Sequence, residues 1–241
     1  MNLFDNYNLL LKSCIDSNYD FVDFCRINQT SNKSIIIRHD IDCSPNLALK
    51  MAKIEHKIGV KATYFFMLRS PFYNLFTRAN NEAVKEIINL GHNIGLHYDE
   101  GYAARDERLQ ELIDEEIKML ENNFDIKITV VSFHQPSEKI VNNDIFITQI
   151  NTYDKKYFKD IKYLSDSNMK FKEDPISIIK SNTFKKIQML IHPMWWSIKG
   201  DTTEEKFKNT IKLNFEAEQK QILSTERAYG KGKTIKFYKY E

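Results

Sequence analysis

The chain lacks the features that mark several classes of protein. Its three cysteines, Cys14, Cys25 and Cys43, are odd in number and form no Cys-x-x-Cys pair, which favours reduced thiols in a cytoplasmic protein. No apolar stretch is long enough to cross a bilayer. The first residues, MNLFDNYNLLLKSCIDSNYD, lack the basic start and apolar core of a secretory signal. We therefore expect a cytoplasmic protein without a membrane span.

The chain also lacks an excess of charge and any low-complexity or repeated segment. With 35 basic and 33 acidic residues, the formal net charge is +2, which gives no indication of a nucleic-acid partner. Hydrophobic residues make up 42% and charged residues 28%, as in soluble globular proteins. No linker rich in Pro, Gly or Ser divides the chain, so we expect one domain over residues 1–241. The oligomeric state and the role of residues 1–30 stay open.

Segments typical of strands and helices alternate from about residue 34 onward. This alternation predicts an α/β fold in which helices cover parallel strands. The predicted strands are IIIRHD, VKATYFFM, NIGLH, KITVVSFH and KIQMLIH. The predicted helices are CSPNLALKMAKIEHKIG, NNEAVKEIINLG, RDERLQELIDEEIKMLENN and a last one that begins at a capping box of Thr202 and Glu205 and ends near residue 225.

Four of the six histidines lie at the downstream ends of apolar runs. In parallel α/β folds, ligand-binding and catalytic groups gather at the carboxyl ends of the strands. We therefore expect these histidines and two neighbouring aspartates to share one pocket. The residues are His39, His97, His134, His192, Asp40 and Asp42.

Imidazoles and carboxylates together favour zinc or a related divalent ion as the bound group. Ligands from separate strands are typical of a catalytic site with an open position. Asp40 and Asp42 are two residues apart and face the same way on a strand, so that one can bind a metal while the other acts as a base. Taken singly, each of the four histidines fits a hydrogen-bonded core or loop residue as well. His56 and His92 are assigned to structural roles.

The segment HDIDCSPNLALKMAKIEHKIGVKATYFF, followed by GHNIGLH, resembles the polysaccharide deacetylases. It is most similar to their cytoplasmic branch with a His-Asp-x-Asp signature, which is associated with surface-polysaccharide biosynthesis. The resemblance covers about residues 34–196 and implies a distorted seven-stranded (β/α) barrel. It also implies a metal-dependent hydrolase that removes an N-acyl group, acetyl or formyl, from an amino sugar, a nucleotide sugar or a glycan intermediate. The implied cofactor is a divalent metal, with Zn²⁺ favoured.

The resemblance also implies roles for individual residues. Asp42 and His97 match metal ligands of the family, and His192 matches the histidine that protonates the leaving group. Two positions depart from the family: Ile41 stands where the catalytic base is expected, and Gly101 stands where a second metal-binding histidine is expected. We predict that Asp40 replaces the base and that His134 supplies the missing imidazole. Asp99, two residues after His97, is an alternative ligand or a substrate contact.

Other residues near these motifs are predicted to bind the substrate. Arg38 and His39 lie beside the acidic pair, where they either orient it or hold an anionic group; Arg38 fits a buried ion pair equally well. Asp166 lies in the segment YLSDSN, where the related branch has a Ser-Asp-Ser segment. Trp195 and Trp196 follow His192, and a sugar ring can stack on such flat apolar faces.

Two other functions fit the same residues. Ile41 and Gly101 motivate a non-catalytic or repurposed sugar-binding protein on the same barrel. A glycosidase-like acid–base pair of Asp40 and Asp42 is less favoured, because carboxylates on one strand end seldom flank a glycosidic bond from opposite sides.

Overall fold

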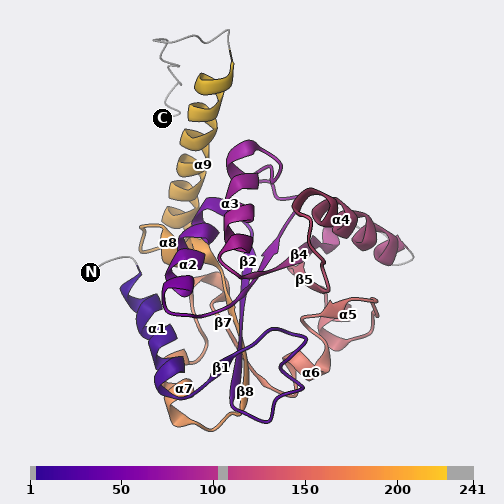
Figure 1. Cartoon of the computed structure of the whole chain (residues 1–241), viewed down its shortest axis with the longest axis vertical. Helices are drawn as coiled ribbons and strands as arrows, with labels where there is room; N and C mark the ends of the chain where they lie inside the picture. Colours follow the sequence, from indigo (N-terminus) through magenta and orange to yellow (C-terminus); the bar gives the residue numbers. More distant parts are fainter. Residues whose placement is uncertain (1–3, 103–107, 227–241) are drawn as a thin grey trace.

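The computed structural model describes residues 4–102 and 108–226. Its centre is one curled sheet of parallel strands, surrounded by helices (Figure 1). Seven strands follow the order β6-β5-β4-β3-β2-β8-β7, and the two-residue strand β1 pairs with β2. This arrangement confirms the predicted α/β fold, with seven parallel strands in one curled sheet. The strand bounds are β1 Asp20–Phe21, β2 Ser34–Ile41, β3 Thr63–Phe66, β4 Asn93–Asp99, β5 Val130–His134, β6 Ile150–Asn151, β7 Lys162–Ser165 and β8 Lys186–Ile191.

The predicted helices are present, and shorter elements fill the segment between residues 137 and 186. The helix bounds are α1 Asp5–Asp16, α2 Pro45–Lys57, α3 Arg78–Asn89, α4 Leu109–Phe124, α5 Glu138–Asn142, α6 Lys155–Phe158, α7 Pro175–Ser181, α8 Pro193–Ser197 and α9 Thr203–Thr225. The predicted start of α4 at residues 105–107 lies outside the described residues. Two 3₁₀ turns, Glu100–Tyr102 and Ser167–Met169, follow β4 and β7.

The alternation of side chains along each strand separates two layers of the core. On β2, Ile35, Ile37 and Ile41 belong to the large cluster between the sheet and the outer helices. Ile36 points the other way and packs with Phe65 in a small cluster inside the curled sheet. Because side chains alternate along a strand, residues 38, 40 and 42 follow Ile36 toward the inside. The same alternation determines which side chains of β4, β5 and β8 face the inside of the sheet.

The inside of the sheet is tight near β3 and β4. A Cβ atom on Gly95 would lie 2.4 Å from the ring of Phe65, so a glycine is needed for these two strands to approach. This close packing fills the inside of the curled sheet at the level of Phe65 and Gly95. Open space remains at the carboxyl ends of the strands.

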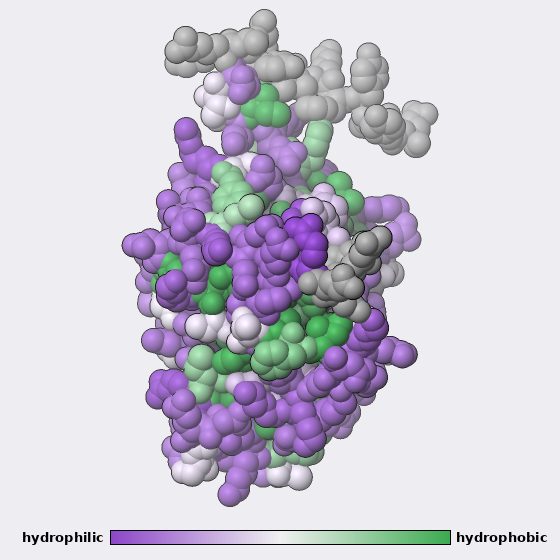
Figure 2. All heavy atoms as spheres, turned by 90° about the vertical axis from the view of Figure 1, so that its right-hand side faces the viewer, coloured by the Kyte–Doolittle hydropathy of each residue, from purple (hydrophilic) through white to green (hydrophobic). Residues whose placement is uncertain are grey.

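Helix α9 begins at the predicted capping box of Thr202 and Glu205 and extends beyond the body of the molecule (Figure 1). Its first turns are fixed to the body, since the amine of the buried Lys206 donates to the backbone oxygens of Trp195 (2.5 Å) and Ile198 (2.7 Å). The face seen in Figure 2 is mostly hydrophilic, with a smaller apolar patch near its middle. Among the described residues, no helix has both the length and the apolar character required to span a membrane.

Candidate functional site

Three side chains from the ends of β2, β4 and β5 meet at one point. Asp42 Oδ1 lies 3.0 Å from His97 Nε2 and 3.2 Å from His134 Nδ1, and these two nitrogens are 3.3 Å apart. Ligands held tetrahedrally at about 2.1 Å from one zinc ion lie about 3.4 Å from each other. The three atoms therefore fit the face of a tetrahedral metal site. Asp42 and His134 are partly exposed, which leaves the remaining position open to the cavity.

The strands and the loop after β3 hold this arrangement in place. His97 and Ser132 are register partners on β4 and β5, and His134 is one inward-facing position further along. Asp42 directly follows β2, where Ser70 Oγ donates to the Asp42 backbone oxygen at 2.7 Å. Tyr73 donates in the same way to the oxygen of Ile41 at 2.7 Å. No sequence pattern indicates these two loop contacts.

Ser132 sets the orientation of the His97 ring. Its hydroxyl lies 2.7 Å from His97 Nδ1, so Nε2 is the nitrogen that faces Asp42 and His134. Such a hydrogen bond on the far ring nitrogen is the usual support of a metal-binding histidine. The same hydroxyl lies 3.3 Å from Asp40 Oδ1. Ser132 was missed in the sequence, although it lies two residues before His134 and hence on the same face of β5.

Asp40 forms a buried two-point ion pair with Arg38. Arg38 Nε lies 2.9 Å from Asp40 Oδ1, and Arg38 Nη2 lies 2.7 Å from Oδ2. Burial raises the pKa of Asp40, but the charges of Arg38 and His97 outweigh burial and lower it below its usual value. Asp40 is therefore ionised, and it lines the cavity beside Asp42. Of the two roles considered for Arg38, the structure places it in the ion pair.

His192 lines the same cavity as His97 and is held by Asp166. Its Nδ1 is 2.7 Å from Asp166 Oδ1, and its backbone N–H lies 3.1 Å from both oxygens of that carboxylate. Its Nε2 points toward Asp42, at 3.9 Å from Oδ2. Burial lowers the pKa of His192, but Asp166 and Asp42 outweigh it and raise the pKa to about 9. The imidazole is therefore protonated at neutral pH and can donate a proton.

The carboxylate of Asp42 and the imidazole of His134 shift each other's pKa. Burial raises the pKa of Asp42, but hydrogen bonds from His134 and His97 outweigh it and bring the pKa far below its usual value. The hydrogen bond to Asp42 raises the pKa of His134, against the opposing effect of burial. In the absence of an ion, the cluster is thus held together by an ionised carboxylate. The same negative charge attracts a divalent cation.

Several predicted substrate contacts lie elsewhere, and their placement is corrected. His39 points to the outer layer of the core, because it is an odd-numbered residue on β2, and its Nε2 lies 2.6 Å from Glu55 Oε1. Asp166 is buried and holds His192 in place of a substrate. Trp196 donates from Nε1 to Asp166 Oδ2 at 2.7 Å and so supports that carboxylate. Asp99 accepts from the backbone N–H of Gly101 at 3.1 Å and is not among the three clustered ligands.

A cavity of about 640 Å³ opens above these groups. Asp40, Asp42, His97, His134 and His192 line it. Phe72, Trp195 and Phe207 form an aromatic wall of the same cavity: the Phe72 and Phe207 rings stack at 5.9 Å, and Trp195 meets Phe207 edge-on at 5.6 Å. Trp195 is thus the predicted aromatic residue that lines the cavity.

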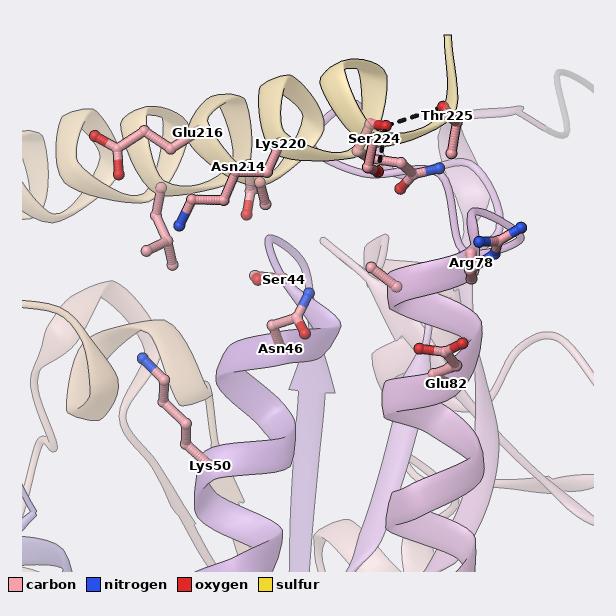
Figure 3. Close-up of a pocket in the computed structure, with 14 residues that line it drawn as sticks. Ser44, Asn46, Lys50, Arg78, Glu82, Asn214, Glu216, Lys220, Ser224 and Thr225 are labelled. Atoms are coloured by element: carbon pink, nitrogen blue, oxygen red, sulfur yellow. Dashed lines mark hydrogen bonds between the residues drawn. The ribbon is translucent and has the colours of Figure 1, made fainter. Parts of the chain in front are cut away.

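A second groove lies beneath α9, at the start of α2 and α3 (Figure 3). Its volume is similar, about 600 Å³, and its lining includes Lys50, Arg78 and Lys220. None of the predicted site residues lines this groove. The chemistry of the described residues is therefore concentrated in the first cavity.

Comparison with protein-family models finds no match, and comparison with curated proteins finds none either. The solved structures to which the chain is similar include carbohydrate esterases of family 4. A family 4 pseudoenzyme from Bacillus anthracis matches at 15% identity and a TM-score of 0.43, over 78% of this chain and 62% of that one. The chain thus spans less than two thirds of that protein.

For two further structures, the match covers a larger share of the other protein. The peptidoglycan deacetylase PdaC from Bacillus subtilis, in a mutant form, matches at 12% identity and a TM-score of 0.48, over 83% of this chain and 98% of that one. A family 4 acetyl xylan esterase from Clostridium thermocellum, in complex with a cobalt ion, matches at 13% identity and a TM-score of 0.45. That match covers 76% of this chain and 84% of the esterase.

Proposed function

We propose that this protein is a metal-dependent hydrolase that removes an N-acyl group, acetyl or formyl, from an amino sugar or from its nucleotide-linked or glycan form. One observation carries the proposal. The three-ligand cluster of Asp42, His97 and His134 lines the same cavity as His192, a protonated histidine that is held by the carboxylate of Asp166. An amide hydrolase needs both a group that activates water and an acid that protonates the departing amine.

Asp42, His97 and His134 are the residues that would hold the ion, with zinc favoured by their two imidazoles and one carboxylate. A bound divalent ion polarises the acyl carbonyl and lowers the pKa of a water molecule. Asp40 would act as the base for the attacking water, because it is ionised and lines the same cavity. Arg38 keeps the carboxylate ionised and fixes its orientation.

His192 completes the reaction on the side of the leaving group. As the C–N bond breaks, Nε2 donates its proton to the departing amine, and the acyl group leaves as the carboxylate. Asp166 accepts the hydrogen bond from Nδ1, which keeps the proton-bearing Nε2 directed into the cavity. The aromatic wall offers flat apolar surfaces on which a sugar ring can lie.

The alternative of a non-catalytic sugar-binding protein was motivated by Ile41 and Gly101. Ile41 is buried in the outer core cluster, whereas Asp40 and Asp42 both line the cavity. A carboxylate is therefore available beside the ligand cluster even though Ile41 stands at the position of the family's base. This favours the hydrolase over the binding protein.

The test is a turnover assay on protein that has been stripped with chelator and refilled with Zn²⁺. The probes are N-acetylglucosamine, its nucleotide diphosphate form and an N-acetylglucosamine tetrasaccharide, each also as the N-formyl derivative, with the free amine as readout. We expect one class of probe to be hydrolysed, with the activity lost in chelator and restored by the ion. Sugar binding that is indifferent to chelator, without release of amine from any probe, would instead support the binding protein.

A further inference from the structure

The N-terminal helix α1 lies outside the segment that carries the motifs, yet one of its side chains reaches toward the site. Tyr7 is fully buried, and its ring lies 5.4 Å from the ring of Trp196, centre to centre. Phe171 contacts the same indole at 6.4 Å. Trp196 follows His192 by only four residues on the short helix α8. The indole is thus held between aromatic rings from two distant parts of the chain.

Trp196 leads directly to the predicted acid. Its indole N–H donates to Asp166 Oδ2 at 2.7 Å, and the other oxygen of Asp166 lies 2.7 Å from His192 Nδ1. One oxygen of the Asp166 carboxylate therefore binds the indole, and the other binds the imidazole of His192. If the indole turns away, Asp166 loses a donor in a buried position, and only the contacts with His192 still orient its carboxylate.

Tyr7 is itself rigidly anchored at its other end. Its hydroxyl donates to Glu55, a buried carboxylate on α2. Glu55 also accepts from the hydroxyl of Tyr64 at 2.6 Å and contacts His39 Nε2 at 2.6 Å. Moving the Tyr7 ring would leave part of this buried network unsatisfied, which is unfavourable. The ring is therefore a fixed surface against which the indole packs.

We propose that Tyr7 is a positioning residue for the proposed reaction: by packing on Trp196 it fixes Asp166, and through Asp166 it fixes the proton-donating His192. The inference rests on the proposed function for its catalytic meaning. It assigns α1 a part in the site. Loss of one hydrogen bond to a charged group lowers a rate by about tenfold when it acts on the transition state.

The first experiment follows the indole proton of Trp196 by NMR and needs no substrate. The chain has two tryptophans, so a Trp195→Phe variant identifies the Trp196 signal. We expect slow hydrogen exchange in the wild type and at least about tenfold faster exchange in Tyr7→Leu, because the ring that holds the indole is gone. Tyr7→Phe keeps the ring and should retain the protection.

Leu11→Ala is the matched control, because Leu11 is fully buried on the same helix. It should lower the melting temperature while leaving the exchange of the Trp196 indole unchanged. Equal loss of protection in Leu11→Ala and Tyr7→Leu, or full protection in Tyr7→Leu, would overturn the inference. If Tyr7→Leu does not fold, Tyr7→Met, which keeps more of the buried volume without a ring, takes its place with the same two outcomes.

The second experiment measures kcat and KM on the N-acyl probe that is turned over. Tyr7→Leu and Trp196→Phe should each lower kcat by about tenfold with little change in KM, and Leu11→Ala should change neither below its melting temperature. A rise in KM at constant kcat would contradict positioning of the acid. If the wild type turns over no probe, the proposed function fails, whereas the exchange result still decides whether Tyr7 positions Trp196.

Discussion

Two clusters of one carboxylate and two histidines lie on opposite sides of the same sheet. One is inside the barrel at the carboxyl ends of the strands, and the other is in the outer layer, between the sheet and its helices. They resemble each other in composition and in the close approach of carboxylate oxygen to imidazole nitrogen. The inner cluster is Asp42, His97 and His134, and the outer cluster is Glu55, His39 and His92.

The difference between the clusters is what the carboxylate oxygens already bind. Glu55 is fully buried and receives hydroxyl donors from Tyr7 and Tyr64 in addition to His39, so three of its about four lone-pair sites are occupied. Asp42 is partly exposed, lines a cavity, and its side chain contacts imidazoles alone among the described partners. One carboxylate and two histidines are therefore not sufficient for a metal site. The carboxylate must also be accessible and must have lone pairs that no protein donor occupies.

The pKa values do not separate the clusters. Burial raises the pKa of Glu55, but His39 and His92 outweigh it, so the pKa of Glu55 is lowered just as that of Asp42 is. Both carboxylates are thus ionised at neutral pH. We assign catalysis and metal binding to the inner side of the sheet. We assign a contribution to stability to the outer cluster.

The largest expected effect is on the inner side. Asp40→Asn removes the proposed base and should lower kcat by about 1000-fold, a typical contribution of general base catalysis. Metal content should stay at the wild-type level, because Asp40 is not one of the three clustered ligands. A metal titration on the same sample shows that the variant is folded. Retention of full activity would exclude Asp40 as the base.

The outer cluster should respond in stability instead. Glu55→Gln leaves His39 and two tyrosine hydroxyls without a buried charged acceptor, and we expect a loss of about 3 kcal/mol in the free energy of unfolding. Urea unfolding of the metal-free protein measures it. The bound metal per folded chain should not change. A Glu55→Gln variant that loses its metal but not its stability would reverse the roles of the two clusters.

Activity should depend on the proton of His192. Because Asp166 and Asp42 raise the pKa of His192 to about 9, above its ordinary value, the acid is charged at lower pH and loses its proton as the pH rises through about 9. The rate should therefore fall above that pH. Asp166→Asn removes the main raising charge, so the alkaline limb should move to lower pH. A limb that stays in place in Asp166→Asn would show that another group titrates there.

The smallest expected effect comes from Ser132→Ala. Loss of the hydroxyl at 2.7 Å from His97 Nδ1 frees that ring to turn, and metal affinity should fall by about tenfold to 100-fold. Isothermal titration with Zn²⁺ measures the change. Ser197→Ala is a matched control, since Ser197 is also a buried serine and its hydroxyl has no hydrogen-bond partner among the described residues. Equal effects in both variants would argue against a specific role of Ser132.

The strand ends could be predicted from the sequence because the apolar runs are short, continuous and followed by polar residues. Their parallel order then brings His97, His134 and His192 together. Alternation along β2 also predicts that Asp40 and Asp42 face the same way. The same alternation predicts that His39, the odd-numbered neighbour of Asp40 on that strand, faces away from the cavity. There it contacts Glu55. The prediction that His39 shares the pocket was wrong because residues that are adjacent on a strand point to opposite faces of the sheet.

The supporting contacts could not be predicted, since they join segments without a regular pattern. Asp166 follows a four-residue strand and reaches His192 across 26 positions of the chain. Tyr7 and Glu55 are 48 positions apart on α1 and α2, and the role of residues 1–30 was left open by the sequence. Only the packing of the helices on the sheet determines which of their polar side chains meet in the core.

Metal content tests the central claim most directly. Wild-type protein, His97→Ala and His39→Ala would be stripped with chelator, refilled with Zn²⁺, freed of excess ion and analysed by elemental mass spectrometry. We predict about one zinc per chain in the wild type and in His39→Ala, and almost none in His97→Ala. A wild type without metal, or a loss that is equal in both variants, would contradict the assignment of the inner cluster as the metal site.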